Sequence, residues 1–167
     1  MNKILIFVLF LITVSFAPQK ERAFQEGEWF KFRIHYGIVN AGYATMEVKE
    51  AVRNNKKVHH AIGRGFTTGM TKFFFKVDDD YESYFDKDTI KPYVFKRKID
   101  EGGYKKHRIT SFNYDSKKAY IQDFTMQTDT SVAFTNVQDM MSSFYFLRNT
   151  DTKDLKIGDE IKLDMFM

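Results

Sequence analysis

Cysteine is absent from this chain of 167 residues, and proline is almost absent, with 2 residues. The lack of cysteine excludes disulfide bonds, thiol catalysis, cysteine-ligated zinc and a lipid-modified N-terminal cysteine. The fold must therefore be stabilised by its core alone. The scarcity of proline, which interrupts strand ladders, favours extended strand pairing.

A strong charge of one sign is also lacking. The chain has 26 Lys and Arg against 22 Asp and Glu, a formal net charge of +4. No basic run resembles a nucleic-acid-binding arm. We interpret the charges as an ordinary solvated surface and expect no nucleic-acid partner.

Aromatic residues, by contrast, are in excess. They make up 17% of the sequence, with 18 Phe and 9 Tyr, beside 43% hydrophobic and 29% charged residues in total. This composition supports a packed core in one domain rather than disorder. Because Phe and Tyr favour pleated, half-buried surfaces, it indicates a mainly β fold.

The N-terminus has the pattern of an export signal, which we place at residues 1–17. Lys3 supplies the positive charge, Ile4–Phe16 is an apolar stretch too short for a comfortable membrane span, and Ser15-Phe16-Ala17 is a small-x-small cleavage site. Pro18 fits poorly after a cleavage site, so an uncleaved N-terminal anchor is the alternative. Either way we expect an exported protein of the periplasm or envelope.

After a polar lead-in at residues 18–27, one β-rich domain is predicted at 28–167. In its first strand, Phe30, Phe32, Ile34 and Tyr36 share one face, which we expect to be buried. Alternation of apolar and polar residues predicts strands at Glu28–Tyr36, Tyr43–Val52, Val58–Arg64, Asp79–Phe85, Lys91–Asp100, Tyr104–Tyr114 and Ala119–Phe124.

One helix is predicted at Val137–Arg148. Asn136 is its expected N-cap, with Asp139 three residues on in the manner of a capping box. A last strand is predicted at Glu160–Met167 and ends inside an apolar alternation. Because domains rarely end on an open apolar edge, we expect the natural chain to continue with strands that cover it. The helix prediction rests on apolar residues at i, i+3, i+4 and i+7 spacing, namely Val137, Met140, Met141, Phe144 and Leu147.

The stretch Gly63–Asp86 interrupts the alternation. It places Phe73, Phe74 and Phe75 between two lysines, and three consecutive phenylalanines cannot all point inward from a strand. At least one must face a partner layer, a ligand cavity or a membrane surface; the alternative is a buried segment that crosses beneath the helix. We expect the stretch to leave the sheet and to carry these residues across one open end of it.

No catalytic or metal-binding constellation is visible. The four histidines lack the HxxxH and HExxH spacings, and no serine has a nucleophile-elbow context. Asp78-Asp79-Asp80 could hold a calcium ion, but the spacing and the glycine of a calcium loop are missing, which favours a solvated strand entrance. We therefore expect no catalytic residue, no metal and no cofactor.

Four segments together resemble a family of bacterial exported proteins catalogued as domain of unknown function 3108 and frequent in Bacteroidetes. They are Arg33–Val48 (RIHYGIVNAGYATMEV), Gly63–Asp86, Asp100–Tyr104 (DEGGY) and Asp139–Leu147 (DMMSSFYFL). The resemblance implies export, an antiparallel β fold and a longer chain, and it supplies no catalytic residues. A looser similarity of architecture is to periplasmic lipoprotein-carrier folds, in which helices cap a curved antiparallel sheet.

These observations predict a mainly β fold: a curved antiparallel sheet, half-barrel or open barrel, with one amphipathic helix packed on its concave side. We expect non-enzymatic binding of a hydrophobic or lipid-like ligand between sheet and helix. The alternative is a structural or interaction module of the envelope, in which the long strands of Lys91–Tyr114 offer an edge or a face to a protein partner. The candidate ligand contacts are Phe73, Phe74, Phe75, Met140, Met141 and Phe144.

Overall fold

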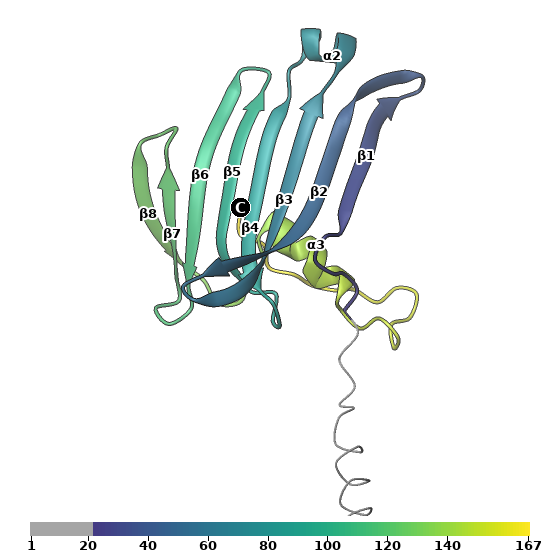
Figure 1. Cartoon of the computed structure of the whole chain (residues 1–167). Coiled ribbons are helices and arrows are strands. Elements are labelled where there is room, and N and C mark those ends of the chain that lie inside the picture. Colours follow the sequence, from purple (N-terminus) through teal and green to yellow (C-terminus); the bar gives the residue numbers. More distant parts are fainter. Residues whose placement is uncertain (1–21) are drawn as a thin grey trace, which may run out of the picture.

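The computed structural model describes residues 22–167, so the predicted signal segment at 1–17 lies outside the described residues. The described chain forms one open sheet of eight strands, each antiparallel to the next and in the order of the sequence (Figure 1). This confirms the predicted mainly β fold, and β1 and β8 are the two edges of the sheet. The strands are β1 (Trp29–Tyr36), β2 (Val39–Arg53), β3 (Lys56–Thr67), β4 (Asp78–Asp86), β5 (Pro92–Glu101), β6 (Tyr104–Asn113), β7 (Lys118–Asp123) and β8 (Thr128–Ala133).

Two-residue turns set the register of two of the hairpins. Gly102 and Gly103, with φ of 54° and 96°, join β5 to β6, in the gap between the strands predicted at Lys91–Asp100 and Tyr104–Tyr114. Asn54 and Asn55 join β2 to β3 with φ of 48° and 58°. Both pairs have the positive φ that the favoured hairpin turns require, and glycine and asparagine adopt it at low cost.

β8 is a strand that the sequence did not predict. All six of its residues are exposed, so it lacks the apolar alternation by which the other strands were recognised. It pairs with β7 along its whole length, from Thr128 opposite Asp123 to Ala133 opposite Lys118. The remaining signal is the run of β-branched residues Thr128, Thr130 and Val132 at every second position, which favours extended structure.

The longer helix, α3 (Met140–Arg148), begins three residues later than predicted. Asp139 rather than Asn136 is its N-cap, because the backbone N–H groups of Met141 and Ser142 both donate to its Oδ1 at 2.8 Å. Its own backbone N–H donates to the Ser142 hydroxyl at 2.9 Å, which completes a capping box. Burial raises the pKa of the Asp139 carboxyl to about 6 in spite of these donors.

The core lies between α3 and the sheet. Tyr145 of α3 is fully buried, and its ring lies 5.5 Å from that of Phe85 in β4 and 4.7 Å from that of Phe24 in the N-terminal segment. Ser142 is also buried, whereas Leu147 is exposed. The buried face of the helix is therefore rotated from the predicted one and includes Met141, Ser142 and Tyr145.

The last segment of the chain is not the strand predicted at Glu160–Met167. A single parallel bridge joins Met165 to Gln138, and the backbone N–H of Phe166 donates to the carbonyl of Gln138 at 2.8 Å. The Phe166 ring packs edge-on against Phe112 of β6, with centroids 5.5 Å apart. The segment thus lies beside the lead-in to α3 and adds to the core instead of extending the sheet.

A second, shorter helix, α2 (Gly69–Phe74), connects β3 to β4 at the other end of the sheet from α3 (Figure 1). Among residues 22–167, neither helix combines the length and the hydrophobicity needed to cross a membrane.

Candidate ligand-binding surface

The helix side of the sheet, meaning the face against which α3 packs, is only partly covered. From β1, Phe30 reaches the core and packs edge-on against Phe144 of α3, with ring centroids 6.1 Å apart. The next residues on the same face, Phe32 and Ile34, are 45% and 51% exposed. The face of β1 that was predicted to be buried is therefore open to solvent, because no element of the described chain covers it beyond α3.

Two glycines of β3 form the floor beside these residues. A Cβ at Gly63 would lie 2.9 Å from the Sδ and Cε atoms of Met141, so the Met141 side chain occupies the space above Gly63. A Cβ at Gly65, two residues further along, would meet no atom within 4 Å. Ala44 of β2 pairs with Gly65 on one side and with Phe32 on the other. Small residues thus leave open space next to the exposed apolar side chains.

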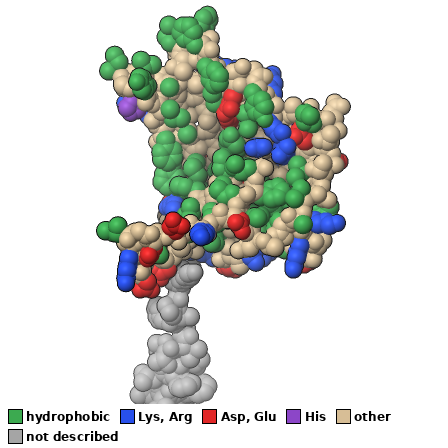
Figure 2. Space-filling model, turned by 180° about the vertical axis from the view of Figure 1, so that it is seen from behind, with side chains coloured by type: hydrophobic (Ala, Val, Ile, Leu, Met, Phe, Trp, Pro, Cys, Tyr) green, Lys and Arg blue, Asp and Glu red, His purple; other side chains and the backbone are tan. Residues whose placement is uncertain are grey.

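We call the residues Phe32, Ile34, Ala44 and Gly65 the open apolar face. Figure 2, in which the helix side is in view, shows hydrophobic side chains gathered on this part of the sheet and again at the end that carries α2. Contiguous exposed apolar surface of this kind is unusual on a soluble domain and typically marks an interaction site.

Charged side chains border the helix side on the far strands. Arg108 of β6 donates to Asp123 of β7, with Nη2 to Oδ2 at 3.0 Å, and Lys106 Nζ lies 3.1 Å from the same oxygen. The backbone N–H of Met126 together with these two cations holds the pKa of Asp123 well below its usual range. The two cations together more than balance the negative charge of Asp123, which leaves this group with one positive charge in excess.

Arg97 of β5 lies between Tyr81 and Arg108 in one rung across the helix side. Its Nε is buried and has no hydrogen-bond partner among residues 22–167. The acid two residues from Tyr81, Asp79, accepts instead from the backbone N–H of Asp100 at 3.0 Å. The guanidinium as a whole is half-buried, and such a cation beside an apolar surface is suited to an acidic or carbonyl group.

The structure separates the six predicted contact residues into two groups. Met141 belongs to the core above Gly63, and Met140 and Phe144 are half-buried beside it. Phe73, Phe74 and Phe75 lie at the opposite end of the sheet, in α2 and directly after it (Figure 1). Protein atoms fill the space between α3 and Gly63, where a ligand was expected to lie.

The stretch around α2 leaves the sheet after Thr67, whose side-chain oxygen accepts from the backbone N–H of Val77 at 2.9 Å. Phe73 and Phe74 project into solvent and are 87% and 78% exposed. The prediction of a departure from the sheet is confirmed. The expected crossing of an open end of the sheet is wrong, because the connection joins the neighbouring strands β3 and β4. The alternative of a buried segment beneath the helix is also wrong, because no residue of α2 is buried.

Comparison with known families gives a match over most of the chain. Residues 31–167 match the model of the family described as Protein of unknown function (DUF3108). The chain belongs to the DUF3108 family. The matched range includes the whole open apolar face and both helices. No curated protein and no solved structure matches the chain significantly.

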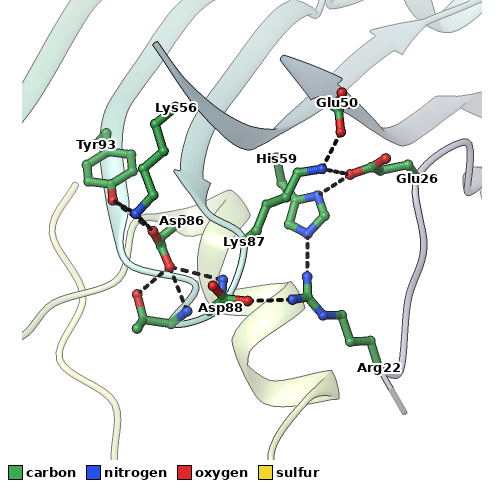
Figure 3. Close-up of polar contacts among 10 residues, drawn as sticks. Arg22, Glu26, Glu50, Lys56, His59, Asp86, Lys87, Asp88 and Tyr93 are labelled. Atoms are coloured by element: carbon green, nitrogen blue, oxygen red, sulfur yellow. Dashed lines mark hydrogen bonds and ion pairs between the residues drawn. The ribbon is translucent and has the colours of Figure 1, made fainter. Parts of the chain in front are cut away.

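At the other end of this DUF3108 domain, an ionic cluster fixes the N-terminal segment to the sheet (Figure 3). Arg22 pairs with Asp88 at 2.7 Å and lies 3.2 Å from Nε2 of His59, while Lys87 pairs with Glu26. Burial lowers the pKa of His59, so this histidine is neutral near pH 7. The cluster joins three segments of the chain, as a structural contact does.

The three consecutive aspartates of this DUF3108 domain do not converge. Asp79 lies on the helix side, whereas Asp78 and Asp80 lie on the other face, because successive strand residues alternate. Asp80 pairs with Arg64 at 3.0 Å and Asp78 with Lys76 at 3.8 Å. Within the described part of the chain, no three acidic or histidine side chains are grouped in a way that would hold a metal ion.

A cleft of about 500 Å³ lies between the β2–β3 turn and strands β5 to β7. Its lining includes Arg53, Lys56, Tyr93 and Tyr120. Lys56 is already paired with Asp86 at 2.5 Å. This lining mixes charged and polar side chains with aromatic ones, which makes it less suited to a wholly hydrophobic ligand than the open apolar face is.

Sequence reasoning missed Gly65 and Arg97 as members of the candidate surface. Two signals could have found them. Gly63 and Gly65 sit at alternate positions inside a strand, a pattern that marks a close approach or an unfilled floor. Arg97 stands on the same face as the core residue Phe95, where an apolar side chain would be expected.

Proposed function

We propose that this DUF3108 protein is exported and binds a hydrophobic or lipid-like ligand on its open apolar face without catalysing a reaction. The observation that carries the proposal is the exposure of Phe32 and Ile34 beside the unfilled space at Gly65. These residues share a face with the core and are about half exposed, so leaving the exposed half in water forgoes about 1 kcal/mol of burial energy for each side chain. A ligand that covers them recovers this energy.

The ligand would lie beyond α3 and not beneath it. Met141 fills the space over Gly63, and Tyr145 is fully buried, which leaves the region next to α2 as the free part of the helix side. Arg97 lies on the helix side two strands from Gly63, and its half-buried guanidinium supplies a positive charge for a polar head group. An acyl chain with an acidic head would match both features.

The location of the protein is part of the same proposal. The positive and then apolar residues 1–17 support export to the periplasm or envelope. A lipid-like ligand is abundant at that location.

The test compares a double variant, Phe32→Ser with Ile34→Ser, with the control Phe124→Ser, whose phenylalanine is 50% exposed in the β7–β8 turn. Native mass spectrometry after gentle purification reports any bound lipid, and an uncharged solvatochromic dye reports binding in solution. We expect the wild type and the control to bind and the double variant to lose binding while it still folds and unfolds cooperatively; a lower melting temperature is expected, because Phe32 stacks on Phe30 with ring centroids 5.9 Å apart. Absence of both lipid and dye binding in the wild type would overturn the proposal.

A second candidate function is an envelope interaction module that contacts a protein partner. The strands of Lys91–Tyr114, which were expected to offer an edge, are interior, because β5 and β6 each have two neighbours. The observation that favours the second function is the fully exposed edge strand β8, since an open edge can pair with a strand of another chain. Crosslinking in cells followed by purification would yield a stoichiometric protein partner and no lipid if this function is the correct one.

A further inference from the structure

Apolar side chains also protrude at the end of the sheet that carries α2. Two neighbouring connections meet there, the β1–β2 turn and α2 with its flanking residues (Figure 1). We call the residues Tyr36, Ile38, Met70, Phe73 and Phe74 the aromatic tip. All five are exposed, and the two phenylalanines of α2 are 87% and 78% exposed. Figure 2 shows hydrophobic side chains standing out at this end of the molecule.

The aromatic tip is formed by two segments of the sequence that contain no acidic residue. Neither Lys31–Met46 nor Gly65–Val77 contains an Asp or a Glu, although the whole chain has 22 of them. The same two segments contain Lys31, Arg33, Lys72 and Lys76. The tip therefore combines exposed aromatic side chains with two nearby cations, Arg33 and Lys72, that pair with no acid among residues 22–167, whereas Lys76 is paired with Asp100 at 2.6 Å and Asp78 at 3.8 Å.

The backbone beneath the tip is fixed. The N–H of Thr68 donates to the carbonyl of Ala41 at 3.1 Å, which joins α2 to the β1–β2 side, and the N–H of Phe75 donates to Thr71 at 2.8 Å. Residues Phe73 and Phe74 thus project from a defined helical turn. A convex, aromatic and basic projection is complementary to the interfacial region of a bilayer, where aromatic rings and Lys or Arg side chains are favoured. It is not complementary to a small molecule, which requires a concavity.

We propose that the aromatic tip inserts into the surface of an anionic lipid bilayer and orients the domain on it. This goes beyond the proposed function, because it concerns other residues and holds whether or not the open apolar face binds a ligand. The strand β1 connects the open apolar face with the aromatic tip, because Ile34 of the face precedes Tyr36 of the tip on this strand. A lipid molecule could then exchange between bilayer and open apolar face without passing through water.

The absence of cysteine from the chain allows a local test. A single cysteine is introduced by Met70→Cys in the tip or, as the matched control, by Ile157→Cys in the exposed segment after α3. Each full-length protein is labelled with an environment-sensitive fluorophore and mixed with vesicles of phosphatidylcholine alone or with one quarter phosphatidylglycerol. Because the apolar N-terminal segment of the full chain can itself associate with vesicles, the local probe is more informative than co-sedimentation.

We expect a blue shift and an intensity gain at position 70 with the anionic vesicles and no change at position 157. Adding Phe73→Ser and Phe74→Ser should abolish the shift while the melting temperature stays the same, because both side chains are exposed. Lys72→Glu should weaken binding to anionic vesicles about tenfold or more. The proposal would be overturned by unchanged fluorescence at position 70 or by an equal or larger change of fluorescence at position 157. It would also be overturned if the fluorescence at position 70 responded only to a protein partner.

Discussion

Gly65→Glu should prevent ligand binding and leave the fold intact. An added Cβ at Gly65 would meet no atom within 4 Å, so the new side chain displaces nothing. Removing a glycine from the interior of a strand stabilises the fold by about 0.5–1 kcal/mol. The new carboxylate would lie opposite Asp79 in β4, and like charges across a strand pair destabilise by about 0.2–1 kcal/mol. The free energy of unfolding should therefore change by less than about 1 kcal/mol.

The effect on binding should be much larger. A ligand on the open apolar face would cover the new carboxylate, and taking an ion out of water is unfavourable by several kcal/mol. Even about 3 kcal/mol corresponds to a Kd more than 100-fold higher. Binding and stability should thus respond to the same substitution by very different amounts.

The assay is an equilibrium titration with an uncharged dye, so that charge repulsion with the probe is avoided, together with urea unfolding of each protein. Val52→Glu is the control, because Val52 is exposed in β2 at the other end of the sheet. We expect the control to bind as the wild type does. Wild-type affinity in a Gly65→Glu protein of wild-type stability would refute the placement of the ligand.

Three further predictions concern the core. Met141→Ala should lower the free energy of unfolding by about 2–5 kcal/mol, as measured in urea, because it leaves a cavity over Gly63 that the sheet cannot fill. Tyr145→Phe should raise it by about 1 kcal/mol or more, because the buried Tyr145 hydroxyl has no partner in the described chain; a loss of stability would show that a partner exists. Burial raises the pKa of Asp139 to about 6, so the folded state takes up a proton that the unfolded chain does not, and stability should rise as the pH falls through that value. Relative to Asp139→Asn, which retains the cap, the wild type should gain up to about 3 kcal/mol between about pH 7 and about pH 4.

The strands could be predicted because their alternation and their turns agree. The Gly102-Gly103 pair places the β5–β6 hairpin to within one residue, since few other residues adopt positive φ twice in succession. The start of α3 was misplaced because Asn136 and Asp139 are both good N-caps, and the choice depends on a tertiary contact. Ser83 of β4 donates to Oδ2 of Asp139 at 2.5 Å, a bond that the local sequence does not reveal.

The candidate surface was harder to predict, for a different physical reason. Alternation shows that Phe30, Phe32 and Ile34 share a face, but it cannot show whether a second layer covers that face. Here α3 is short and reaches only Phe30, so the next two residues stay exposed. For the same reason Met141 appeared to be a ligand contact, although its neighbour Gly63 makes it part of the core.

The contacts that stabilise the fold differ between the two ends of the sheet. Because of this difference, an effect of a variant on binding can be measured separately from its effect on stability. At the α3 end, Arg148 binds Glu28 through two bonds of 2.5 and 2.9 Å, and the N-terminal segment is held by Arg22 and its partners. At the α2 end, Phe73 and Phe74 have lost almost none of their accessible surface, so they add little to the free energy of folding. A phenotype of variants at these two residues would therefore report on what the tip contacts, because the fold does not depend on them.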